Sequence, residues 1–147
     1  MSDNPIKTRS ATLPGHLIRR LHQLSTKVFT DQTRAAGFDL TPIQYVALDA
    51  LRENEGIDQA GLATAIAKDR ATTGSVIDRL DQKGLIARRI SRRDKRAREL
   101  ALTPQGADLL DRMTPVVEAL QADILPGLTT DEYAQFIALA AKATLTD

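Results

Sequence analysis

The sequence predicts a mainly α-helical chain that is interrupted by one short β-hairpin. Apolar residues recur at helical spacing along most of its 147 residues, whereas segments 85–90 and 99–102 are too short for helices and favour strands. The densest charge lies between these two segments. Seven of the eleven residues 88–98 are Lys or Arg, although the formal net charge of the chain is only +1. The predicted fold class is therefore mainly α with a small β element that carries concentrated positive charge.

Length and composition fit a single domain over residues 1–147, with 42% hydrophobic residues available for a core. The chain has no cysteine, which excludes disulfides and thiolate chemistry. Residues 1–10 are polar, and no apolar run approaches the roughly 20 residues that a membrane-spanning helix needs. We therefore expect a cytoplasmic protein without a membrane partner.

The first helix is expected within residues 11–37, where apolar residues from Leu13 follow at spacings of three and four until Gly37. A second helix opens at the capping box of Thr41 and Gln44 and continues to about Glu53. Its expected buried residues are Ile43, Val46, Ala47 and Leu51.

A short third helix, capped by Asp58, is separated from the fourth by only Lys68 and Asp69. Asp69 is the expected N-cap of that fourth helix, which continues to about Lys83 and ends at Gly84. Two helices joined by so tight a turn form a helix-turn-helix. The fourth helix is expected to bury Thr73, Val76, Ile77 and Leu80.

The segments 85–90 and 99–102 are expected to pair as antiparallel strands with the cations at the connecting tip. Thr103 and Pro104 then start a long helix, whose apolar residues form a narrow seam typical of helix-on-helix packing. The last helix opens at a capping box of Thr129 and Glu132. Its expected inward residues are Tyr133, Phe136, Ile137 and Ala140.

The outward face of the fourth helix is small and hydroxylated, which suits close approach to the major groove of DNA. The cations of the hairpin suit the phosphate backbone or the minor groove beside it. Asp94 is expected to pair with Arg96 and to fix the shape of the tip. The candidate DNA-binding residues are Arg70, Ala71, Thr72, Gly74, Ser75, Arg79, Arg92, Arg93, Lys95 and Arg96.

Six short motifs lie within residues 13–145, at 41–45, 69–73, 78–80, 83–86, 93–97 and 102–106. Together they resemble the MarR family of bacterial winged helix-turn-helix regulators. The resemblance implies a homodimer held by residues 11–37 and 103–147, with residues 41–102 as the DNA-binding lobe. It also implies that the fourth helix enters the major groove and the hairpin, or wing, enters the minor groove. Such a dimer would repress at a pseudo-palindromic operator with half-sites about 10 bp apart.

The chain departs from this family pattern at Gly74 and Ser75, where many relatives carry Thr and Arg, so base readout is expected to depend on Arg70, Thr72 and Ser75. Without cysteine, the oxidation sensing known in the family cannot operate. We therefore expect control by a small molecule and no cofactor.

The start of the first helix resembles a subgroup of these regulators that includes controllers of aromatic and heteroaromatic acid catabolism. His16 and Arg20 lie four residues apart, so both could bind one carboxylate, with Arg19 beside them. Phe38 or Tyr45 would provide an aromatic wall. The alternative is that these polar side chains make contacts between the two protomers.

Other functions are disfavoured by what the sequence contains. The two histidines are six residues apart and project in different directions on a helix, and there is no phosphate-binding glycine loop, so an enzyme is not expected. Only 3% of residues are aromatic, which disfavours single-strand binding by stacking. A transcriptional activator and a sequence-indifferent architectural protein stay open as alternatives. The identity of the effector and the sequence of the operator also stay open.

Overall fold

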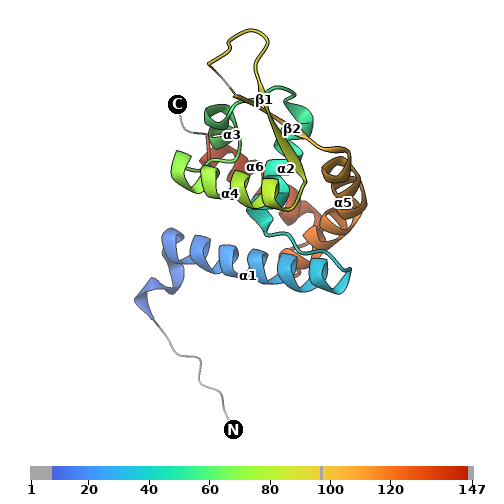
Figure 1. Ribbon diagram of the computed structural model, residues 1–147. Coiled ribbons are helices and arrows are strands. Elements are labelled where there is room, and N and C mark those ends of the chain that lie inside the picture. The colour runs from blue at the N-terminus through green and yellow to red at the C-terminus, as the bar shows by residue number, and fades with distance from the viewer. Residues whose placement is uncertain (1–7, 97, 146–147) are drawn as a thin grey trace. The chain divides into compact units, whose positions relative to one another are not determined.

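The computed structural model describes residues 8–96 and 98–145 of the chain (Figure 1). Ala97, which ends the motif at 93–97, and the terminal residues 1–7 and 146–147 of the predicted domain lie outside the described residues. The elements are a short 3-10 turn Arg9–Thr12, helices α1 Pro14–Ala35, α2 Pro42–Glu53, α3 Gln59–Ala65 and α4 Arg70–Gln82, strands β1 Ile86–Ile90 and β2 Arg98–Leu102, and helices α5 Pro104–Ile124 and α6 Thr130–Ala143. This order confirms the predicted fold class.

The helix boundaries follow the capping signals of the sequence. At α2, the Gln44 N–H donates to Thr41 Oγ1 at 3.3 Å and the Thr41 N–H donates to Gln44 Oε1 at 3.1 Å, so both halves of the capping box form. Thr129 and Glu132 make the same pair of bonds at α6. Side-chain caps therefore set the starts of two of the helices that the sequence predicts.

The chain divides into two compact units. One consists of residues Met1–Val28 and Glu118–Asp147, and the other is the continuous segment Phe29–Val117. The boundaries inferred from sequence, with a lobe at 41–102, stay a prediction. In the described part of the chain, no helix is both long and apolar enough to cross a membrane.

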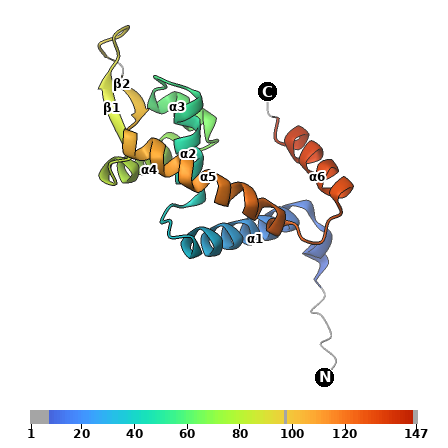
Figure 2. The same cartoon turned by 90° about the vertical axis from the view of Figure 1, so that its right-hand side faces the viewer.

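The unit Phe29–Val117 is built on a core that α2, α3, α4 and the hairpin share. Its most deeply buried side chains include Leu48, Leu62, Ile77 and Leu80, each at most 1% exposed. The strands pair antiparallel from Ile86 opposite Leu102 to Ile90 opposite Arg98. Ile86 and Leu100 anchor the hairpin base in the core, while its tip extends beyond α3 and α4 (Figure 2). The four residues expected to be buried on α4 are all buried.

Two expectations about apolar faces are wrong. Val46 of α2 is 43% exposed, and α6 has no buried residue, with Ile137 48% exposed. Hydrophobic periodicity shows which residues share a helix face, but a face left at the surface of the chain has the same pattern as one packed in its core. Further exposed apolar side chains lie on or beside α1, at Leu13, Leu17, Ile18 and Leu24.

Candidate nucleic-acid interface

The turn between α3 and α4 is held by two backbone hydrogen bonds that close α3. The Ala67 N–H donates to the Thr64 carbonyl at 3.2 Å, and the Lys68 N–H donates to the Ala63 carbonyl at 3.0 Å. This pattern needs a left-handed residue, which is usually glycine, yet here Ala67 adopts it with φ 54°. The helix-turn-helix therefore contains a strained alanine that sequence reasoning did not identify.

Asp69 caps α4 and also engages a residue expected to read DNA. Its carboxylate accepts the Thr72 backbone N–H at 2.8 Å and the Thr72 hydroxyl at 2.7 Å. These two hydrogen bonds hold the pKa of the Asp69 carboxyl below its usual 3.8, and the bond from the Thr72 backbone N–H has the larger effect. Because the Thr72 hydroxyl donates its hydrogen to Asp69, it has only acceptor capacity left for a base or a bound water.

The outward face of α4 contains the predicted recognition residues. Arg70, Ala71, Thr72, Ser75 and Arg79 are exposed, whereas Gly74 is half-buried. The Ser75 hydroxyl donates to the Ala71 carbonyl at 3.3 Å, so it is also engaged within the helix. Among the described residues, the guanidinium groups of Arg70 and Arg79 have no hydrogen-bond or ion-pair partner. On this face, the free donors therefore belong to the two arginines.

Gly74 lies where α3 and α4 approach each other. Gln59 Nε2 of α3 donates to the Arg70 carbonyl at 3.3 Å, and a Cβ on Gly74 would be 3.2 Å from the same nitrogen. The predicted role of Gly74 was to let the helix approach DNA. In this structure its lack of a side chain also makes room for the Gln59 contact between the two helices.

The recognition helix is tied to the wing by Arg88 of β1. Its guanidinium forms a hydrogen-bonded ion pair with Asp78 and lies 3.9 Å from the carboxylate of Asp81. Both carboxylates belong to α4 and lie three residues apart, so one side chain contacts adjacent positions of the helix. The sequence pattern indicates Arg88 only as one cation of the basic segment 88–98.

The wing tip is shaped by a buried serine and an aspartate. Ser91, only 7% exposed, accepts the backbone N–H groups of Arg93 and Asp94 at 3.2 and 3.3 Å. Asp94 accepts the Arg96 backbone N–H at 2.9 Å. The expected pairing of Asp94 with Arg96 therefore exists, but through the main chain instead of the guanidinium group.

These bonds leave the charged side chains of the tip directed to solvent. Arg92, Arg93, Lys95 and Arg96 are all exposed, and within residues 8–96 and 98–145 none of their charged groups forms an ion pair. Four such cations on a fixed turn can contact phosphates without first losing an internal partner.

The five residues predicted to bind a ligand are divided between the two units. His16 is half-buried and Arg19 and Arg20 are exposed in the unit that contains Met1–Val28, whereas Phe38 and Tyr45 belong to Phe29–Val117. A shared site for the five stays a prediction.

Both aromatic residues of this set already have polar neighbours. The Tyr45 hydroxyl is hydrogen-bonded to Thr114 Oγ1 at 2.9 Å, and the Arg112 guanidinium lies 5.8 Å from the centre of the Phe38 ring. The Tyr45 ring also packs obliquely on Phe29, with ring centres 6.3 Å apart. These contacts connect the end of α1 and the start of α2 to α5.

Comparison with known proteins shows the same fold and family. A family model described as MarR family matches residues 38–97. The transcriptional repressor NicR of Pseudomonas putida is 34% identical over 128 residues, which cover 87% of this chain and 80% of NicR.

Two solved structures extend the comparison. A structure of Bordetella bronchiseptica BpsR, reported for the regulation of its DNA binding by 6-hydroxynicotinic acid, superposes with a TM-score of 0.85 at 31% identity and covers 97% of this chain and 100% of BpsR. A variant of Escherichia coli MarR in complex with operator DNA has a TM-score of 0.83 at 25% identity, covering 95% of this chain and 100% of MarR. This chain therefore belongs to the MarR family of winged helix-turn-helix transcriptional regulators.

Proposed function

We propose that this protein is a homodimeric transcriptional repressor that binds a pseudo-palindromic DNA operator and is released from it by a small aromatic carboxylate. The observation that supports DNA binding best is the pairing of two surfaces in one unit. The outward face of α4 presents the free guanidinium groups of Arg70 and Arg79, and the wing that follows presents four exposed cations. Arg88 links the two surfaces through Asp78.

The two surfaces have different expected roles. The wing cations are suited to phosphates, which every duplex presents, so they provide affinity and register. Arg70 and Arg79 can reach base edges in the major groove, where an arginine reads guanine through two hydrogen bonds. Thr72 and Ser75, whose hydrogens are donated within the chain, are expected to contribute as acceptors or by close approach.

Dimerisation is supported by the apolar surface that a single chain leaves uncovered. Helix α6 buries no residue, although Ile137 and Leu139 lie on it, and Leu17 and Ile18 of α1 are exposed as well. Exposed apolar side chains in such number are typical of surfaces that pack against another chain. A two-fold dimer also matches the symmetry of a palindromic operator.

Release by an aromatic carboxylate is supported by similarity to BpsR, whose DNA binding is regulated by 6-hydroxynicotinic acid. The residues proposed for this ligand are His16, Arg19, Arg20, Phe38 and Tyr45. A regulator that acts on chromosomal DNA in this way would work in the cytoplasm and needs no catalytic group.

The DNA assignment is tested by selecting bound fragments from the source genome and measuring affinities by fluorescence anisotropy. Arg93→Ala and Arg96→Ala should weaken binding to operator and random duplex alike and flatten the salt dependence. Arg70→Ala should in addition reduce the preference for operator over random DNA. If all three variants lost affinity equally on both duplexes, α4 would not be the reading element.

The ligand assignment is tested with 6-hydroxynicotinate and benzoate as probes. Each probe that binds should raise the melting temperature and weaken operator binding. The double variant His16→Ala, Arg20→Ala should show a clearly smaller response in both measurements while it still binds the operator without acid. An unchanged response of this variant would remove both residues from the effector site.

A further inference from the structure

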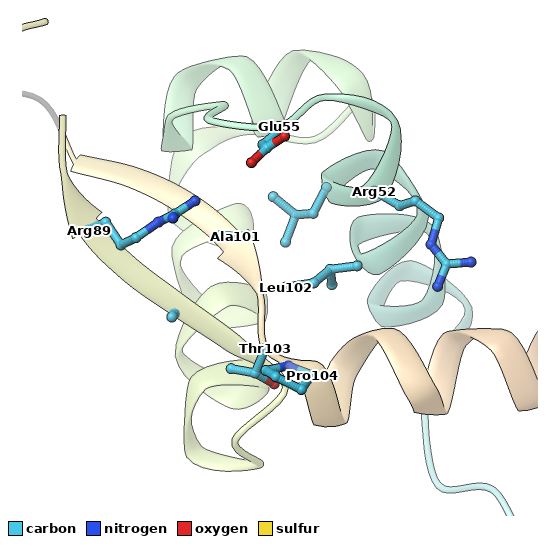
Figure 3. Close-up of a pocket in the computed structure, with 9 residues that line it drawn as sticks. Arg52, Glu55, Arg89, Ala101, Leu102, Thr103 and Pro104 are labelled. Carbon is cyan, nitrogen blue, oxygen red and sulfur yellow. The ribbon is translucent and has the colours of Figure 1, made fainter. Parts of the chain in front are cut away.

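A hollow lies between the end of α2 and the outer face of the wing. Its volume is about 470 Å³, within the range of small-molecule pockets. Its lining comes from the end of α2, the turn with Glu55 that follows α2, both strands of the wing and the start of α5 (Figure 3). All the lining residues belong to the unit Phe29–Val117.

The hollow exists because the hairpin places its two smallest side chains opposite each other. Ala87 and Ala101 are direct partners in the strand register, so no large side chain covers this part of the sheet. Leu51, which is 3% exposed, and Leu102 add apolar surface beside the two alanines. The result is an apolar floor on the solvent side of the wing, where a sheet usually carries longer polar residues.

Two opposite charges border this floor without neutralising one another. Arg89 and Glu55 have no ion pair or hydrogen bond with any described side chain. In Figure 3 the Arg89 side chain extends from β1 toward β2, and the Glu55 side chain projects from the turn that follows α2. Glu99 stands opposite Arg89 in the register, but its carboxylate lies by Gly56, 3.6 Å from where a Cβ on that glycine would be.

The other arginine of the hollow is already occupied. Arg52 forms an ion pair with Asp111 at 2.7 Å and donates to the Ala107 carbonyl at 3.0 Å, both on α5. In Figure 3 its guanidinium points away from the hollow. Arg89 is therefore the cation available to an incoming anion.

We propose that this hollow is a second effector site, which binds a small planar aromatic carboxylate that also bears a hydroxyl or ring N–H donor. The carboxylate accepts from the Arg89 guanidinium, the donor on the ring bonds to the Glu55 carboxylate, and the ring covers Ala87, Ala101 and Leu102. Charge-assisted hydrogen bonds at two ends of a rigid ligand select for this chemistry. The inference rests on the proposed function for its regulatory meaning, but it uses none of the residues proposed on α1.

Occupancy of the site weakens DNA binding through charge. Arg89 belongs to the cationic segment of the wing, so an anion bound to it cancels one positive charge beside the phosphates. The ligand also bridges the strands to α2 and α5, which makes the position of the wing depend on occupancy. Linkage then requires that bound DNA weakens the affinity for the acid by the same factor.

The experiment measures binding of 4-hydroxybenzoate and of benzoate to the full chain by isothermal titration calorimetry. It is run in the His16→Ala, Arg20→Ala background, so that heat from the proposed α1 site does not contribute. Both acids should bind, and 4-hydroxybenzoate should bind more tightly because only it can donate to Glu55. Arg89→Gln should weaken both acids by about tenfold or more, since a charge-assisted pair is lost.

Three further variants separate the parts of the site. Glu55→Ala, which has no acceptor for the ligand hydroxyl, should remove the preference for the hydroxylated acid and leave benzoate binding unchanged. Ala101→Leu should weaken both acids by filling the floor, while its unfolding transition shows that it is folded. Arg92→Gln, which removes an equal charge from the wing outside this hollow, is the matched control and should bind both acids like its parent.

The possible results distinguish the second effector site from the proposed function. If neither acid binds in this background, or if Arg89→Gln and Ala101→Leu bind as the parent does, the second site does not exist. Operator release that depends only on His16 and Arg20 would overturn this inference and leave the proposed function intact. Failure of the wild-type protein to bind any duplex without acid would instead overturn the proposed function, whatever the calorimetry shows.

Discussion

Arg88 of the wing and Asp78 of the recognition helix form an ion pair, so one of the seven cations in segment 88–98 faces α4. The guanidinium also lies 3.9 Å from Asp81. Without Arg88, the carboxylates of Asp78 and Asp81 on α4 would remain uncompensated. Under the proposed function, Arg88 would therefore be a positioning residue, which links the helix proposed to read bases to the wing proposed to contact the backbone.

Replacing Arg88 tests this role. Arg88→Gln should weaken operator binding by about three- to tenfold. Without the cation, the negative carboxylates of Asp78 and Asp81 would repel the negative phosphates of the DNA. The triple variant that adds Asp78→Asn and Asp81→Asn should recover part of the loss, since the repulsion is gone. Anisotropy titrations at several salt concentrations provide the measurement.

The salt dependence separates Arg88 from a direct phosphate contact. Arg92→Gln, the matched control in the wing, should reduce the salt slope by about one. Arg88→Gln should reduce that slope by clearly less than one, because it changes only the screened repulsion between the α4 carboxylates and the phosphates. A reduction by about one for Arg88→Gln would mean that this arginine itself binds the backbone.

The strained turn of the helix-turn-helix predicts a stabilising substitution. Ala67→Gly should raise the free energy of unfolding by about 1 kcal/mol, because glycine adopts the left-handed conformation without the Cβ clash. Ala50→Gly, in the middle of α2, is the matched control and should lower it by about 1 kcal/mol. Urea denaturation monitored by circular dichroism measures both, and equal losses in the two variants would contradict the strain.

The close approach of α5 to the base of the wing predicts a destabilising substitution at Gly106. A Cβ on Gly106 would lie 2.0 Å from the Leu85 carbonyl oxygen, so Gly106→Ala must displace the start of α5 from the strand entry. The expected loss in unfolding free energy is about 1–3 kcal/mol. Gly15→Ala adds the same methyl in α1 where no atom lies within 4 Å, and it should not destabilise the chain.

The cap of the recognition helix predicts a dependence on acid. The pKa of Asp69 lies below its usual 3.8 in the folded chain because Thr72 donates its backbone N–H and its hydroxyl to the carboxylate. The stabilisation is therefore fully present above the unfolded pKa and is lost as pH falls through the lower folded pKa.

Asp69→Asn keeps a capping oxygen but cannot titrate, so its urea midpoint should fall less than that of the wild type between pH 6 and pH about 3. Asp69→Ala should have a lower midpoint at both pH values. The assignment would be wrong if wild type and Asp69→Asn lost stability in parallel.

Local signals predicted the elements of this fold well. Thr41 and Gln44 form the expected capping box, Gly84 ends α4 with φ 72°, and Thr73, Val76, Ile77 and Leu80 are buried as their spacing indicated. Each of these features depends on residues within a few positions of one another, which is the range at which sequence patterns are informative.

Contacts between distant segments were not predicted. Arg88 is ten residues from Asp78, and Arg52 is 59 residues from Asp111, so no local pattern pairs them. The hollow beside the wing depends on Ala87 facing Ala101, which requires the strand register. Val46 and Ile137 are exposed although their spacing predicts burial, because periodicity identifies an apolar face without identifying what covers it.

Helix α6 has a complete capping box but buries none of its residues within its own chain. A helix of this length has little stability in water on its own, and in the proposed homodimer a second protomer would cover it. Mass action would then make the melting temperature rise with protein concentration. In a cell, the abundance of this regulator would set the fraction of molecules that are assembled and competent for DNA, before any effector acts.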